Sequence, residues 1–253
     1  MNSAGAYIWQ LVAVVSFLIV GARLLRLSRR TREAPEKLLG LYFFASGLAF
    51  LGWTISTIFD FEGMEAQIDP VIWFDLVPWA VYGIGMVPLM LFTRVVFRPG
   101  EAWAKWMIGA CTLLLFSATT MWFVQRPDYY SINNPWYWCE WLGYTIPYCW
   151  VTIEAFVSYS GASRRARVGL CDRVVANRYL LFGWFGAVHA SGCVTDIFEA
   201  MEYAANQTVT VGIDFAMGAA QLAGIVILFL VFFPPAVYQR WISAEPATGA
   251  VDG

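Results

Sequence analysis

Charge is scarce in this chain of 253 residues, of which 13% are charged and 59% are hydrophobic. A soluble domain is about half apolar and about a quarter charged, whereas the mean hydropathy here is +0.58. The composition therefore excludes an ordinary soluble protein and predicts a single integral membrane domain over residues 1–253. The lipid bilayer is its expected environment, and we expect no nucleic-acid partner.

Histidine and paired cysteines are lacking as well. His189 is the single histidine, which excludes a bis-histidine haem site and a multi-histidine zinc site within one chain. The five cysteines are scattered without a C-x-x-C spacing, so neither a disulfide framework nor a thiolate metal site is indicated. The motifs G-x-S-x-G and H-E-x-x-H and a phosphate-binding glycine loop are also absent. We therefore expect neither an enzyme nor a metal site, and the cofactor, if there is one, stays unknown.

Long apolar runs, in contrast, are abundant. A helix needs about 20 largely apolar residues to cross the hydrocarbon core of a membrane. Seven runs of this kind lie near residues 7–25, 38–59, 71–97, 103–123, 136–157, 179–200 and 211–238. None alternates with period two, so we predict an all-α bundle of seven transmembrane helices. Pro234 and Pro235 are expected to loosen or end the last helix, and residues 241–253 to form a disordered tail.

The basic residues predict the orientation of this bundle. All of them except Arg126 fall on one side, in the loops that follow the first, third, fifth and last helices. By the positive-inside rule this side is cytoplasmic, so the N-terminus lies outside and the C-terminus inside. We expect a multi-pass protein of the plasma membrane, and the excess of arginine over lysine suggests a bacterial inner membrane. The same basic loops are candidate contacts for a cytoplasmic or membrane signalling partner.

An internal repeat is indicated when the chain is shifted by 139 residues. The shift aligns identical residues at Gly47/Gly186, Asp75/Asp214 and Gly85/Gly224, among others. A duplication would give a 3+1+3 plan, with parallel repeats over 1–98 and 136–240 joined by the helix at 103–123. Apolar composition inflates such matches, so a chance similarity stays the alternative.

Polar residues form a stripe on the predicted helix at 179–200. His189, Cys193 and Asp196 are spaced i, i+4, i+7 and therefore share one face. An ionisable group that faces lipid at this depth costs several kcal/mol, so we expect the stripe to face the bundle interior. Other carboxylates and aromatic residues cluster toward the outer side. The complete candidate ligand site consists of Asp75, Trp79, Tyr82, Glu140, Tyr144, Tyr148, His189, Asp196, Glu199, Asp214 and Gln221.

Carboxylates among aromatic rings suit a cationic amine, through charge and ring-face attraction. Two plainer interpretations stay open: the aromatic residues form an interfacial belt, and His189 makes a structural hydrogen bond between helices.

The overall plan resembles that of the microbial rhodopsins. The resemblance is carried by seven helices, an outside N-terminus, the run "PLML" in the third helix and Asp214 near the start of the last. In that family a retinal-binding lysine follows this aspartate by four positions, but Gly218 stands there and the helix has no lysine. The counter-ion position, judged from Pro88, falls on Tyr82. A retinal Schiff base is therefore not available. The plan also resembles the 3+1+3 sugar transporters, whose proline–glutamine pairs are absent.

These features favour a receptor-like or sensory membrane protein that binds a small ligand or chromophore non-covalently in an outward-facing acidic and aromatic pocket. The first alternative is a small-solute or proton-coupled transporter, which predicts a second gate at Glu154, the single inner carboxylate within a span. The second alternative is a structural subunit of a membrane complex, and a homo-oligomer is compatible with either.

The charge distribution generates a topology prediction. A reporter fused after Arg240 should be cytoplasmic, and a reporter inserted within residues 203–209 should be exported, because the positive-inside rule places the two on opposite sides. Alkaline phosphatase and green fluorescent protein fusions measure both positions. The reverse result at both would contradict the orientation.

Overall fold

The computed structural model describes residues 3–61, 70–125, 132–206 and 211–243. Within these ranges the side chains of residues 3–9, 57–61, 70–76, 203, 206 and 211–217 lie outside the description. The described residues form eight helices and no strand: α1 (Ser3–Thr31), α2 (Ala34–Phe61), α3 (Pro70–Phe97), α4 (Ala102–Gln125), α5 (Pro135–Arg167), α6 (Arg173–Asn206), α7 (Val211–Phe232) and α8 (Ala236–Ser243). The predicted all-α class is therefore confirmed.

Five of these helices are long and apolar enough to cross a membrane, as expected for a multi-pass protein. They are α1, α2, α3, α4 and α6, and the bent pair α7–α8 makes up to six among the described residues. The predicted crossing by α5 stays a prediction, because buried Glu140 and Glu154 and many tyrosines and tryptophans lower the hydropathy of this helix.

The last predicted span ends earlier than expected. Helix α7 stops at Phe232, before Pro234 and Pro235, and α8 begins at Ala236 with a bend of 74°. Residues 241–243, expected to belong to a disordered tail, are the last turn of α8. Proline lacks the N–H that a continuing helix requires, which explains the break.

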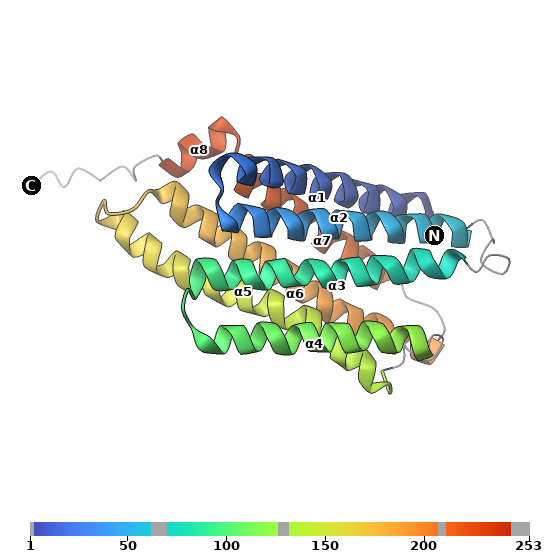
Figure 1. Ribbon diagram of the computed structural model, residues 1–253. Coiled ribbons are helices and arrows are strands. Elements are labelled where there is room, and N and C mark those ends of the chain that lie inside the picture. The colour runs from blue at the N-terminus through green and yellow to red at the C-terminus, as the bar shows by residue number, and fades with distance from the viewer. Residues whose placement is uncertain (1–2, 62–69, 126–131, 207–210, 244–253) are drawn as a thin grey trace, which may run out of the picture.

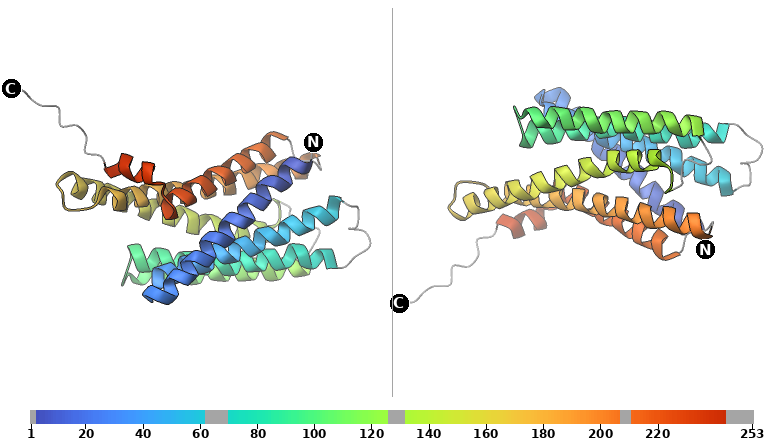
Figure 2. Two further views of the ribbon diagram at one scale, coloured as in Figure 1. Left: turned by 90° about the horizontal axis from the view of Figure 1, so that it is seen from above. Right: turned by 90° about the horizontal axis from the view of Figure 1, so that it is seen from below.

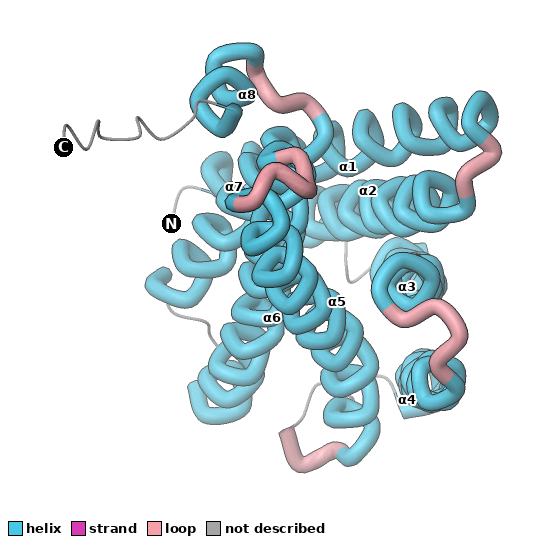
Figure 3. Tube along the Cα trace, turned by 90° about the vertical axis from the view of Figure 1, so that its left-hand side faces the viewer, coloured by secondary structure: helices cyan, strands magenta, loops and turns pink. Residues whose placement is uncertain are grey.

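The helices pack mainly against their neighbours in the chain. Helices α1 to α4 follow one another along one side of the bundle, and α5, α6 and α7 form the other side (Figures 1 and 3). The two sides meet where α1 contacts α7 and where α3 and α4 contact α5. Helix α4 lies at the edge and turns Trp106, Leu113 and Phe116 outward. Helix α5 is instead central.

Local signals explain where α5 begins and ends. The side chain of Asn134 accepts a hydrogen bond from the Trp136 N–H at 3.0 Å, and Pro135 occupies the first turn. Both are favoured at helix N-termini. At the other end Gly169 takes a positive φ of 75° in the turn to α6. This turn reaches beyond all other helix ends on the same side of the bundle (Figures 1 and 2).

A close backbone approach joins α1 to α2. A Cβ atom at Gly21 would lie 2.6 Å from the backbone nitrogen of Phe44, whereas a Cβ at Gly161 on α5 would meet nothing within 4 Å. A side chain at Gly21 must therefore push two backbones apart.

This contrast gives a matched pair of substitutions. Gly21→Ala should destabilise the protein by about 1–3 kcal/mol through overpacking. Gly161→Ala should be neutral or stabilising by up to about 1 kcal/mol, because alanine is the better helix former. Unfolding of both variants in the same detergent measures the difference. Equal effects would contradict the close α1–α2 contact.

Candidate functional site

Three tyrosine hydroxyls form a hydrogen-bonded chain in the middle of the bundle. Tyr148 on α5 bonds to Tyr42 on α2 at 2.9 Å and, at short range, to Tyr82 on α3. Tyr42 and Tyr148 are fully buried and Tyr82 is half-buried. Each phenol has one proton to donate and lone pairs to accept. Two bonds use two of the three hydroxyl protons, so the chain retains one proton that a further acceptor can receive.

His189 lies against this chain. Its Nδ1 is 2.8 Å from the carbonyl oxygen of Phe185. A carbonyl only accepts, so Nδ1 carries the proton and Nε2 is the acceptor of the neutral ring. The ring centroid lies 5.1 Å from that of Tyr148, and a Cβ at Gly224 on α7 would be 3.0 Å from Cε1. The structure thus places His189 inside the bundle, and we call Tyr42, Tyr82, Tyr148 and His189 the tyrosine–histidine cluster.

A group of four aromatic side chains continues the cluster. Trp53 on α2 contacts Trp79 and Tyr82 on α3, with ring centroids 4.9 Å and 5.5 Å away. Tyr144 on α5 closes the group, 5.8 Å from Trp79 and 5.0 Å from Tyr82, and its hydroxyl donates to the Trp79 carbonyl oxygen at 3.4 Å. Of the predicted site residues, Trp79, Tyr82, Tyr144, Tyr148 and His189 therefore form one contiguous set.

The structure describes the side chains of only some of the predicted acidic site residues. Asp196 and Glu199 are half-buried on α6, and the Asp196 carboxylate interacts electrostatically with Glu199 and Tyr82. Glu140 is buried on α5. The side chains of Asp75 and Asp214 lie outside the described residues.

Helix α5 also holds the backbone of α6 in this region. The Trp141 Nε1 donates to the Cys193 carbonyl oxygen at 2.6 Å, and the Tyr137 hydroxyl donates to the Asp196 carbonyl oxygen at 3.2 Å. Gln221 is half-buried on α7, one turn before Gly224.

Sequence reasoning missed the contribution of α2. Tyr42 and Trp53 belong to the site but stand in a strongly apolar run. A signal was present, since Tyr42, Ser46 and Trp53 follow the spacing i, i+4, i+11 and share one face, as the stripe on α6 does. Ser46 is fully buried.

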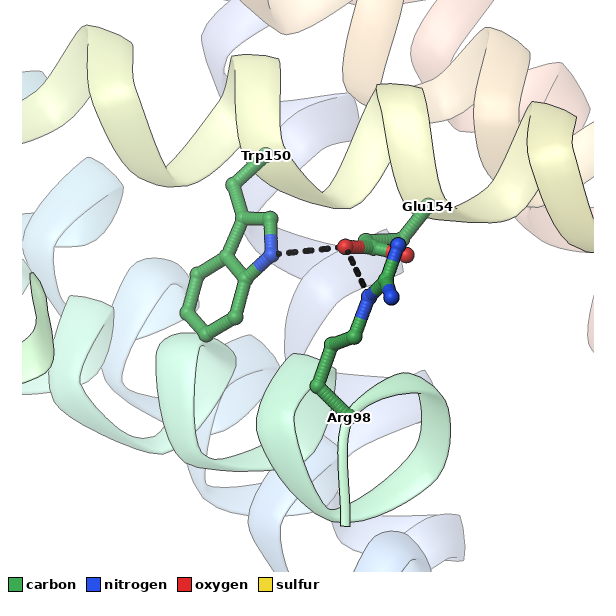
Figure 4. A network of polar contacts seen from close by, with 3 residues as sticks. All are labelled: Arg98, Trp150 and Glu154. Atoms are coloured by element: carbon green, nitrogen blue, oxygen red, sulfur yellow. Dashed lines mark hydrogen bonds and ion pairs between the residues drawn. The ribbon is translucent and has the colours of Figure 1, made fainter. Parts of the chain in front are cut away.

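An ion pair ties α3 to α5 at the basic end of the bundle (Figure 4). The Arg98 Nε donates to Glu154 Oε1 at 2.7 Å, and the Trp150 Nε1 donates to the same oxygen at 3.2 Å. Glu154 is 5% exposed, whereas the Arg98 side chain is 40% exposed. The hydrogen bond that Arg98 donates to Glu154 raises the pKa of the Arg98 guanidinium above its ordinary value. The buried carboxylate is thus compensated by two donors.

In the described ranges, no group of three or more His, Cys, Asp or Glu side chains is placed to hold a metal ion. No protein-family model, no curated protein and no solved structure matches the chain. The expected resemblance to rhodopsins or transporters therefore stays a prediction, and the chemistry of the site has to follow from its own side chains.

The hydroxyl of Tyr148 should matter more than that of any other tyrosine. Tyr148→Phe removes both bonds of the chain and should cost about 1–3 kcal/mol, because the Tyr42 and Tyr82 hydroxyls lose this partner while buried. Tyr42→Phe removes one bond and should cost less. Tyr159→Phe is the control, since the Tyr159 hydroxyl makes no hydrogen bond with the described residues. Equal unfolding midpoints for Tyr148→Phe and Tyr159→Phe would contradict the chain.

Proposed function

We propose that this chain is a receptor-like or sensory membrane protein that binds a small ligand or chromophore non-covalently on the outer side of the tyrosine–histidine cluster. The observation that carries the proposal is this buried cluster, in which hydroxyls and a ring from α2, α3, α5 and α6 touch one another. A ligand that contacts Tyr82 or His189 is connected to four helices through the three contacts that Tyr148 makes.

The proposal includes seven spans, with the N-terminus outside. The basic residues gather at the end of the bundle where α1–α2, α3–α4 and α5–α6 connect and where α8 lies. The positive-inside rule assigns this end to the cytoplasm of a bacterial inner membrane. Asp196 and Glu199 then lie on the outer side of His189, since α6 runs outward.

A cationic or chromophoric ligand fits these residues best. Asp196 and Glu199 supply negative charge in a half-buried setting, and Trp53, Trp79 and Tyr144 supply ring faces nearby. A cation over such faces gains about 0.5–2 kcal/mol, more when desolvated. Asp75 and Asp214 are proposed to extend the acidic wall.

The transporter alternative predicts a second gate at Glu154. The carboxylate of Glu154 accepts hydrogen bonds from Arg98 and Trp150. A receptor requires only that the inner end be closed, and this ion pair joins α3 to α5 there.

One observation favours the internal duplication, which is also part of the transporter alternative. In each proposed repeat a glycine of the second helix packs on the first helix, and a glycine of the third packs on the second. A Cβ at Gly47 would be 2.8 Å from a side chain of α1, and at Gly186 2.4 Å from a side chain of α5. In the third helix of each repeat, a Cβ at Gly85 would be 2.9 Å from a side chain of α2, and a Cβ at Gly224 would be 3.0 Å from a side chain of α6.

The ligand proposal is tested on the protein purified from native membranes. We expect an absorption band or a co-extracted compound in the mass spectrum, or a rise in unfolding temperature with amines such as choline and ethanolamine. Asp196→Asn keeps the shape of the side chain and should abolish this gain while the apo protein stays folded. Asp172→Asn, at the opposite end of α6, is the matched control.

Two results would contradict the proposal. A wild type that carries no compound and is not stabilised by any amine would remove the receptor assignment. If amines raise the unfolding temperature of Asp196→Asn as much as that of the wild type, the ligand binds away from α6.

A further inference from the structure

Helix α8 lies beside the end of α7, outside the group of long helices (Figures 1 and 3). It leaves α7 at 74° after Pro234 and Pro235. If α7 crosses the membrane, a helix bent by this angle runs close to the membrane plane, at the level where the spans of α1 and α7 end.

The surface of α8 is divided into three strips. One strip docks on α6: the Tyr238 hydroxyl accepts a hydrogen bond from the Asn177 Nδ2 at 2.9 Å, and Ile242 is half-buried beside it. The second strip is apolar and open, with Val237 73% and Trp241 74% exposed one turn apart. The third strip is polar and contains Arg240. The apolar strip of Val237 and Trp241 lies between Arg240 and the face that docks on α6.

A second cation lies at the same level. The Arg23 guanidinium sits 4.1 Å above the ring of Phe233, in the link between α7 and α8. Arginine beside tryptophan and tyrosine at a helix end is typical of the lipid headgroup region, where long basic side chains reach the phosphates.

We propose that α8 docks on the cytoplasmic leaflet, with Val237 and Trp241 inserted below the headgroups, and that Arg240 and Arg23 select anionic phospholipid. A protein is the poorer occupant, since a stable interface covers about 800 Å² per partner and this strip offers two side chains. The long helices also expose large apolar side chains, among them Trp106, Leu113 and Phe116. The inference does not depend on the ligand site.

Insertion is tested with full-length protein containing 5-fluorotryptophan, in lipid nanodiscs. Trp241→Phe identifies the fluorine resonance of Trp241, and Trp106→Phe that of Trp106, which is 79% exposed on the apolar face of α4. Doxyl-labelled phosphatidylcholine should broaden both resonances, and an aqueous gadolinium chelate should broaden neither. Broadening of Trp241 by the chelate alone would overturn the insertion.

Lipid selectivity is tested by hydrogen exchange of the α8 amides. Exchange in discs of equal parts phosphatidylcholine and phosphatidylglycerol should be slower than in phosphatidylcholine alone, by about fivefold for each arginine at the surface. Arg240→Gln should reduce this difference by about fivefold, whereas Arg167→Gln, at the projecting α5–α6 turn, should leave it unchanged. Equal exchange in the two discs would overturn the selectivity for anionic lipid.

Discussion

A hydroxyl group in the middle of an apolar bundle needs a hydrogen-bond partner inside the protein, and the Tyr148 hydroxyl has two. Its bonds to Tyr42 and Tyr82 fix α5 against α2 and α3 at one depth. The ring of Tyr148 fixes α6 as well, because His189 packs on it with its proton held on Nδ1 by the Phe185 carbonyl. One side chain therefore contacts three other helices at the same depth.

This constraint explains the unequal roles of α4 and α5. Helix α4 lies at the edge, and its buried side chains are Ala104, Cys111, Leu115 and Ala118. Helix α5 buries Glu140, Tyr144, Tyr148 and Glu154. Bonds to residues beyond α5 join Tyr144 to Trp79, Tyr148 to Tyr42 and Tyr82, and Glu154 to Arg98. The two ends of the bundle differ as a result: the Arg98–Glu154 pair lies at the basic end, and α6 presents Asp196 and Glu199 toward the opposite end.

Composition and spacing predicted the helical class, the long apolar helices and the inward position of His189 and Cys193 on α6, because these depend on local periodicity and on the cost of charge in an apolar environment. They did not predict that Tyr42 belongs to the site. Its neighbours in the sequence are apolar, and its hydroxyl gains a role only through the contact with α5. They also merged α7 with α8. Proline signals a break, but the direction of the next helix depends on the contact between Tyr238 and Asn177. Pairings between distant helices are not encoded in local pattern.

The most direct test is the coupling between the Tyr82 and Tyr148 hydroxyls, measured as a double-mutant cycle. Unfolding free energies are compared for the wild type, Tyr82→Phe, Tyr148→Phe and the double variant under one condition. Their shared hydrogen bond predicts that the double variant loses less than the sum of the single variants, by about 0.5–1.5 kcal/mol. Additive losses would show that the two hydroxyls act independently, and would contradict a connected tyrosine–histidine cluster.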